Sequence, residues 1–182
     1  MAISPIARMS GDDAVVAATG RRAEEWFALL DAAGAAQWPH PRIARWLADE
    51  QGVPSWWRQN LAVRYEQSIG RREPGQKADG TFSVSSSRSV RDDASERAST
   101  AFDAVVVAAS AELEVEPRSR RQHGLRPNAR WTLPTGESVL VAGEPSPGRL
   151  RISVTFGKLA DSTATATAKE RAARILAAAL EG

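Results

Sequence analysis

The sequence contains no cysteine. Disulfide bonds, thiolate metal ligands and cysteine nucleophiles are therefore excluded. The chain also has no apolar run of about 20 residues, the length that a membrane-spanning helix needs. Its start, MAISPIARMSGDDAVVAATG, lacks the compact apolar segment of a signal peptide, because two aspartates interrupt it. We therefore expect a cytoplasmic protein.

Neither sign of charge is in large excess. The chain has 24 Lys and Arg against 22 Asp and Glu, so its formal net charge is +2. Overall charge therefore does not indicate a nucleic-acid partner, and such a function would have to come from local clusters of basic residues. The length of 182 residues and the hydrophobic fraction of 42% are sufficient for one domain or for two small ones.

The first half of the chain predicts helices. Apolar residues recur at helical spacing in EEWFALLDAAGA, HPRIARWL and GVPSWWRQNLAVRYEQ, with glycine or proline between these segments. We expect a three-helix bundle of helix-turn-helix type over residues 20–70, preceded by a flexible arm over residues 1–19. The stretch GRREPGQKADG has three glycines, one proline and no large apolar residue, which predicts a linker over residues 71–80.

From residue 81 the apolar period becomes strand-like. Alternation in TFSVSSSRSV, RWTLP, ESVLVAG and RLRISVTFGKL predicts strands, and AELEVEP alternates in the same way. In TFSVSSSRSV a row of Thr and Ser lies opposite the side that carries the apolar residues, and in RLRISVTFGKL the side opposite the apolar residues has Arg151, Ser153 and Thr155. A helix over residues 92–110 and a long C-terminal helix from about residue 162 complete the pattern. We expect an α+β protein whose second domain, residues 81–182, combines an antiparallel sheet with a long C-terminal helix.

Several stretches carry a resemblance to known families. In the second half these are DGTFSVSSSRSV, AFDAV and RISVTFGKLADSTATATAKERAARILAAAL. They are similar to the START-like helix-grip fold, and more closely to bacterial proteins related to the activator of heat-shock-protein ATPase. The helical stretches of the first half resemble a domain of unknown function that is often found in front of that fold. Only three clear strands follow the basic segment PRSRRQHGLRPNAR, so the resemblance implies a reduced helix-grip domain.

The resemblance implies a binding protein, since related domains bind lipids, polyketides or partner proteins and only a minority are enzymes. The expected ligand is a small apolar or amphipathic molecule, or a protein partner, between the sheet and the C-terminal helix. No cofactor is expected. The candidate lining residues are Phe82, Val84, Arg88, Trp131, Val139, Val141, Ile152, Val154 and Phe156. Arg88 stands on an apolar strand face, where its charge either meets an acidic group or extends to water.

Nothing in the sequence identifies a catalytic centre. There is no G-x-S-x-G elbow and no glycine-rich phosphate loop. The two histidines, His40 and His123, lack the spacing of a metal site, so we expect no metal. An enzyme that acts in the helix-grip pocket is a third hypothesis, behind the two binding hypotheses.

The second hypothesis is a nucleic-acid-binding protein, regulatory or nucleoid-type. The third helix could read bases, and the arginines of the basic segment could hold phosphates, although they could equally balance neighbouring glutamates and protect a sheet edge. Against this hypothesis, residues 20–73 have eight Arg and seven acidic residues, and Trp56 occupies an early position on the reading helix. The candidate contacts are Arg58, Gln59, Asn60, Arg64, Arg71, Arg72, Arg118, Arg120, Arg121 and Arg126.

Overall fold

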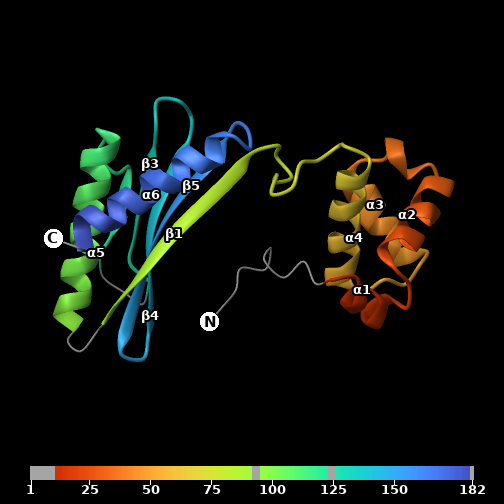
Figure 1. Ribbon diagram of the computed structural model, residues 1–182, viewed down its shortest axis with the longest axis horizontal. Coiled ribbons are helices and arrows are strands. Elements are labelled where there is room, and N and C mark those ends of the chain that lie inside the picture. The colour runs from red at the N-terminus through yellow and green to blue at the C-terminus, as the bar shows by residue number, and fades with distance from the viewer. Residues whose placement is uncertain (1–10, 92–94, 123–125, 181–182) are drawn as a thin grey trace. The chain divides into compact units, whose positions relative to one another are not determined.

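The computed structural model describes residues 11–91, 95–122 and 126–180, and only the backbone of residues 95–97. The described residues form six α-helices, one short 3-10 helix and a five-stranded antiparallel sheet, so the fold is α+β. The chain divides into two compact units, Met1–Gly75 and Gln76–Gly182, each with its own hydrophobic core (Figure 1). No described helix has the length and hydropathy needed to cross a membrane.

The N-terminal unit consists of helices. They are α1 Asp12–Thr19, α2 Ala23–Ala32, the 3-10 helix η2 Ala35–Gln37, α3 His40–Asp49 and α4 Ser55–Ser68. Gly34 and Gly52 follow α2 and α3 with φ angles of 77° and 65°, a conformation that glycine adopts without strain and that ends each helix. The large core side chains are Trp26, Leu30, Ile43, Leu47, Leu61 and Tyr65, none of them more than 3% exposed.

Helix α1 corrects our expectation of a flexible arm as far as residue 19. Val15 is fully buried in the core of the unit, and Arg64 of α4 forms an ion pair of 2.5 Å with Asp12. The Thr19 hydroxyl accepts a hydrogen bond of 2.9 Å from Trp26 Nε1, which connects α1 to α2. So short a helix is stabilised by these tertiary contacts more than by its own sequence, and periodicity alone did not reveal it. Residues 1–10 lie outside the described residues.

The C-terminal unit is built on one sheet. Its strands are β1 Phe82–Arg91, β2 Ser119–Arg121, β3 Asn128–Thr132, β4 Ser138–Ser146 and β5 Arg149–Leu159, and its helices are α5 Ser95–Leu113 and α6 Ala164–Leu180. The strand order is β1-β5-β4-β3-β2, so the first strand pairs with the last and the edges are β1 and β2.

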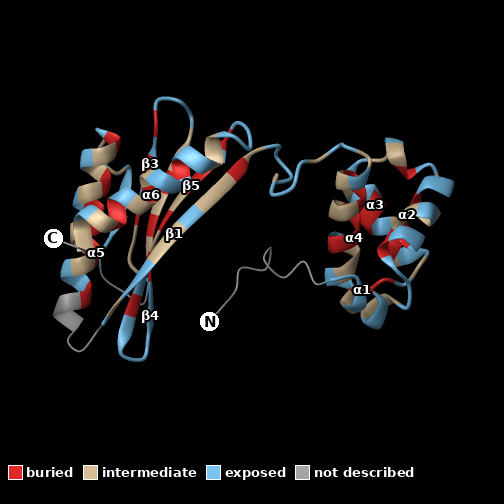
Figure 2. Ribbon diagram, in the orientation of Figure 1, coloured by how far each residue is buried: buried red, intermediate tan, exposed pale blue. Residues whose placement is uncertain are grey.

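Both helices of this unit pack on one face of the sheet, which we call the helix side. Alternate residues of β5, such as Ile152, Val154 and Phe156, are fully buried there together with residues of α5 and α6 (Figure 2). Ser86 Oγ of β1 donates a hydrogen bond of 3.3 Å to the Lys169 carbonyl of α6. Every second residue of β1 counted from Ser86, such as Val84 and Arg88, therefore also lies on the helix side. Because successive strand residues alternate, the remaining side chains point to the opposite face.

The segment AELEVEP differs from its expected structure. Helix α5 continues through Leu113, whose side chain is buried with that of Ala109 four residues earlier, as on one face of a helix. Glu114 then takes a φ of 55° and ends the helix, and the strand begins only at Ser119 as β2. The expected strand over this segment was therefore wrong: its period-two alternation spans the last turn of a helix and a connection.

Candidate functional site

The residues expected to line an interior ligand site lie in the packed core. Seven of them, Phe82, Trp131, Val139, Val141, Ile152, Val154 and Phe156, are at most 3% exposed, and Val84 is half-buried. They share one cluster with Ala168, Ala172, Ile175 and Leu176 of α6, whose alanines allow the helix to approach the sheet closely. Side chains therefore occupy the space where we expected a ligand, and binding there stays a prediction.

The Arg88 side chain extends to water and does not meet an acidic group among the residues that the structure describes. It lies on the helix side of β1 but is exposed, and its Nη1 donates a hydrogen bond of 3.3 Å to the neighbouring Ser87 carbonyl. The side chain thus extends to water along the apolar surface, as long basic side chains do at strand ends. It contributes no charge to an interior site.

The side chains expected to read bases on the third helix have contacts inside their own unit. Asn60 is only 9% exposed. Gln59 Oε1 lies 2.9 Å from His40 Nε2, and Arg64 is paired with Asp12. Arg58 is half-buried. These contacts tie α4 to α1 and α3, so the helix presents few free polar groups to a groove.

The two arginines after α4 also contact their own unit. Arg71 Nη1 donates hydrogen bonds of 3.2 and 2.8 Å to the carbonyls of Ala36 and Trp38. Arg72 Nη1 lies 3.5 Å from Glu66 Oε2, and that same oxygen is 3.0 Å from His40 Nδ1. Glu66 is only 6% exposed, and sequence reasoning had not singled it out as a buried charge. These cations hold helix ends and a buried carboxylate rather than an exposed patch.

The basic segment divides between the two faces of the sheet. Arg120 Nη2 forms an ion pair of 2.7 Å with Asp103 of α5, so Arg120 lies on the helix side. Arg121, its neighbour on β2, is paired in register with Asn128 and points to the opposite face. Arg118 and Arg126 are exposed, and His123 lies outside the described residues. These arginines therefore do not form one cluster, and only Arg121 and Arg130, the last residue of the segment, join the surface described next.

The register brings polar side chains from all five strands to the face opposite the helices, which we call the outer face. Of its side chains, ten carry a hydroxyl and five are arginines, against a single glutamate. The residues are Ser83, Ser85, Ser87, Ser89 and Arg91 on β1; Arg149, Arg151, Ser153, Thr155 and Gly157 on β5; Ser138, Leu140, Ala142, Glu144 and Ser146 on β4; Asn128, Arg130 and Thr132 on β3; and Ser119 and Arg121 on β2.

The outer face concentrates positive charge. Residues 76–182 contain 15 Lys and Arg against 13 Asp and Glu, yet this face has five exposed arginines and only Glu144 of opposite sign. Lys77 adds a sixth cation, since its Nζ lies 3.9 Å from the position that a Cβ atom would take on Gly157. Acidic residues are correspondingly enriched elsewhere on the unit. This separation of arginines from acidic residues follows from the pairing of the strands, and the net charge of the unit does not reveal it.

Hydrogen bonds between side chains hold part of the outer face in place. Arg151 donates to Ser87 Oγ from Nε at 3.2 Å and from Nη2 at 3.0 Å. Thr155 Oγ1 donates to Ser85 Oγ at 3.0 Å. These bonds cross from β5 to β1, so they hold Arg151 and Thr155 as an ordered part of the array of donors. Such an array loses little entropy when it binds an anion.

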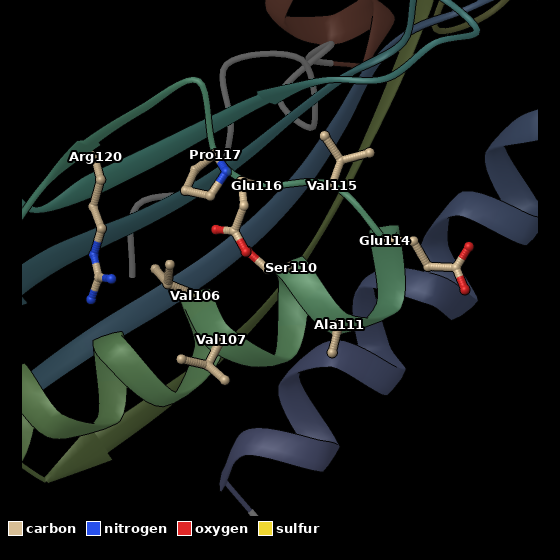
Figure 3. Close-up of a pocket in the computed structure, with 9 residues that line it drawn as sticks. All are labelled: Val106, Val107, Ser110, Ala111, Glu114, Val115, Glu116, Pro117 and Arg120. Atoms are coloured by element: carbon tan, nitrogen blue, oxygen red, sulfur yellow. The ribbon is translucent and has the colours of Figure 1, made fainter.

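A second feature is a cleft of about 470 Å³ beside α5 (Figure 3). It lies between the last turns of that helix and residues 114–117, and Val106, Val107 and Pro117 contribute its apolar surface. Val107 is 64% exposed, the highest value among the described large hydrophobic residues. The Arg120 side chain extends from its strand toward α5 at one end, while Glu114 is directed away from the valines. Sequence reasoning treated these residues only as helix and strand, and missed the cleft.

Comparison with known protein families, with curated proteins and with solved structures finds no match for this chain. Function is therefore inferred from the chemistry of its surfaces. Of these surfaces, the outer face combines the largest number of convergent polar groups with an excess of one charge.

Proposed function

We propose that this protein is a non-enzymatic binding protein whose outer face holds nucleic acid through the phosphate backbone. The observation that carries the proposal is the excess of five arginines over one glutamate on a face that also has ten hydroxyl side chains. Arginine and hydroxyl groups are the usual donors to phosphate oxygens. The proposal moves the nucleic-acid hypothesis from the third helix and the Arg-rich basic segment to the outer face of the sheet.

The side chains of the outer face favour nucleic acid over other anionic partners. Protein interfaces take much of their energy from buried aromatic and large apolar side chains. The outer face has only Leu140 and Ala142 as apolar side chains, and neither is aromatic. Insertion into a membrane surface needs an apolar face as well. Protein–nucleic acid interfaces are polar and strongly positive. Without aromatic platforms for bases, contact with the backbone is expected to be independent of sequence.

The test is salt-dependent binding of fluorescent single-stranded and duplex oligonucleotides, measured by anisotropy on the full chain. The wild-type protein should bind both with an affinity that falls steeply with salt. The triple variant Arg91→Ala/Arg130→Ala/Arg149→Ala should bind more weakly, and the slope of log affinity against log salt should fall by about 2–3, close to one for each lost phosphate contact.

Arg88→Ala is the matched control. It removes an exposed arginine from the same strand as Arg91, but from the helix side. Its affinity and salt slope should equal those of the wild type. If the wild type binds no oligonucleotide at low salt, or if Arg88→Ala weakens binding as much as the triple variant, the proposal is wrong. Equal binding of polyglutamate would instead identify a partner with acidic side chains.

The reduced helix-grip arrangement is the fold relationship that we propose for the C-terminal unit. Two observations support it: β1 pairs with the last strand, and the long α6 contacts β1 and β5 across the sheet. The short sheet and the filled interior are consistent with a member in which binding has moved from the interior to the surface. A solution structure would test the helix-grip arrangement. Chemical-shift changes on addition of an oligonucleotide would test whether binding takes place on the outer face and not in the interior.

The cleft beside α5 supports a second candidate function, the binding of a small amphipathic molecule. The exposed Val107 and an open space of about 470 Å³ carry this candidate, since ligand pockets commonly hold 300–1,000 Å³. Native mass spectrometry of freshly purified protein should then detect a discrete excess mass. That mass should be absent from Val107→Lys and retained in Trp56→Lys, a control at an exposed hydrophobic side chain of the other unit. A bare polypeptide mass in the wild type would exclude a co-purified ligand.

A further inference from the structure

The two edges of the sheet differ in how well they are protected from pairing. The β2 edge has three residues, all exposed, of which two are arginines, and Pro117 and Pro127 lie on either side of it. The β1 edge runs for ten residues, Phe82–Arg91, without a proline or lysine. Proteins normally block a long edge with charges, proline or a covering element, because its outward N–H and C=O groups pair readily with another strand. Strand β1 has two exposed arginines, Arg88 and Arg91, and a register shift between Phe82 and Ser83, but it is far longer than β2 and has no proline, so it is the less protected edge.

Strand β1 also carries apolar surface that its own unit does not fully cover. Val84 and Val90 lie on the helix side of the strand, pack partly against the core and remain half-buried. Its exposed side chains are Ser85, Arg88, Ser89 and Arg91, and the two serines are small enough for a second strand to approach. We propose that β1 pairs in antiparallel fashion with β1 of a second copy of this chain and joins two sheets into one. This inference goes beyond the proposed function and does not depend on it.

The side-chain pattern selects a register for this pairing. In a continuous sheet with two-fold symmetry, helix-side residues must lie opposite helix-side residues. An axis through Ser87 meets this condition and places Val84 opposite the partner's Val90, a favourable β-branched pair that occurs twice by symmetry. It also places Ser85 opposite the partner's Ser89. The two Arg88 side chains lie only diagonally across the axis, about 7–8 Å apart, and both are exposed, so solvent screens their repulsion.

The consequence of this dimer is a larger binding surface. Because the two-fold axis is perpendicular to the sheet, both outer faces lie on the same side. Ten strands would then form one continuous face with twice the positive charge, and one nucleic-acid strand could contact both copies. The second copy therefore adds to the proposed site rather than covering it.

Charge substitutions at two exposed positions test both the dimer and its register. Ser85→Lys/Ser89→Lys puts two lysines opposite each other at two places across the interface. Ser85→Glu/Ser89→Lys puts opposite charges at the same places and loses the same Thr155–Ser85 hydrogen bond. Sedimentation equilibrium of the full wild-type chain should give a concentration-dependent mass that approaches twice 19.6 kDa. The dilysine variant should raise the dissociation constant by about tenfold or more, and the Glu/Lys variant should restore it.

Ser119→Lys on the opposite edge is the control and should leave the dimer unchanged. Far-ultraviolet circular dichroism checks that each variant is folded, and both β1 positions are exposed, so the monomer should tolerate them. A wild-type chain that stays monomeric at all concentrations overturns the inference, as does a dimer that responds to Ser119→Lys and not to the β1 variants. Neither result affects the oligonucleotide test of the outer face, which relies on arginine variants.

Discussion

Asn60 shows, at the scale of a single residue, how burial separates a structural from a functional polar group. Its Oδ1 is buried and accepts no hydrogen bond within the described part of the chain. A buried acceptor without a partner costs about 1–3 kcal/mol. Asn60→Leu should therefore raise the free energy of unfolding by roughly 1 kcal/mol, because the unpaired oxygen is lost and apolar contact is gained.

Urea denaturation of the wild type and Asn60→Leu measures this difference. Asn60→Asp is the control: it keeps an acceptor at the same place and adds a buried charge, so it should lower stability. A lower unfolding midpoint for Asn60→Leu would mean that Oδ1 has a partner in solution. The sign of the change in stability shows whether Asn60 is a buried structural residue. An asparagine that is exposed in order to contact bases would not make the fold more stable when replaced by leucine.

Tyr65 provides a residue-scale prediction about pH. Burial, followed by a hydrogen bond of 2.5 Å donated to Asp31 Oδ1, raises the pKa of Tyr65 to about 12. Because the folded-state pKa is raised, the stabilisation is complete below the pKa of 10.0 of a free tyrosine and is lost as pH rises from 10.0 toward about 12. Tyr65 is the only tyrosine in the chain, so tyrosinate absorbance reports its ionisation directly.

The expected titration midpoint of the folded protein is therefore well above that of the urea-unfolded chain. Tyr65→Phe should remove this pH dependence of stability above pH 10.0 and lower stability at neutral pH by about 1 kcal/mol through the lost hydrogen bond. Identical midpoints for the folded and unfolded wild type would show that the phenol is not held as described.

Helices α5 and α6 are connected by a carboxylate, and this contact supports a prediction at the scale of elements. Glu112 Oε1 accepts hydrogen bonds from Arg174 Nη2 at 2.9 Å and from Arg171 Nε at 3.3 Å. The bond from Arg174 is the main cause that lowers the pKa of Glu112 below 4.5. Since the folded-state pKa is lowered, the stabilisation is present above pH 4.5 and is lost as pH falls through the folded-state value.

Glu112→Gln should lower stability at pH 7 by roughly 0.5–1 kcal/mol, a small value because the pair is partly exposed to water. At a pH well below 4.5 the variant and the wild type should be equally stable. Thermal unfolding at both pH values measures the difference, and Glu114→Gln, at a neighbouring exposed carboxylate, is the control. If the wild type remains more stable than Glu112→Gln at low pH, the lost stability comes from packing and not from the charge of Glu112.

The accuracy with which helices and strands could be predicted from the sequence depended on how many residues each element buries. Long elements with a buried stripe, such as β5 and α6, were located to within a few residues because many side chains repeat the same period. Two errors involve short pieces. Helix α1 buries Val15 alone, and residues 112–116 alternate across a helix end. At such places one or two tertiary contacts decide the conformation, and no period is long enough to reveal them.

The candidate site could be predicted only in part, for a reason that belongs to the scale of the whole sheet. The polar row on each of β1 and β5 is visible in the sequence, because alternation places Ser, Thr and Arg opposite the apolar residues. What could not be predicted is that Arg130 and Arg121 lie on the same face as these rows. That depends on strand order and register across four pairings, which a single strand does not encode.

The division into two units supports a prediction about the whole molecule. The buried residues of the two cores do not overlap: one cluster lies within residues 15–65 and the other within residues 82–176. A large-to-small change should therefore weaken only the unit that contains it. Leu61→Ala and Ile152→Ala are matched, since both remove a fully buried aliphatic side chain, and each should cost its own unit about 2–5 kcal/mol.

Differential scanning calorimetry of the full chain measures both effects in one experiment. Two transitions are expected, because separate cores unfold as separate cooperative units. Leu61→Ala should lower the midpoint of one transition and Ile152→Ala that of the other. The N-terminal unit should unfold first, since a small domain buries a smaller fraction of its surface. If either variant moves both transitions equally, the two units unfold as one cooperative body. The arginine and serine variants of the outer face would then have to be compared at equal stability.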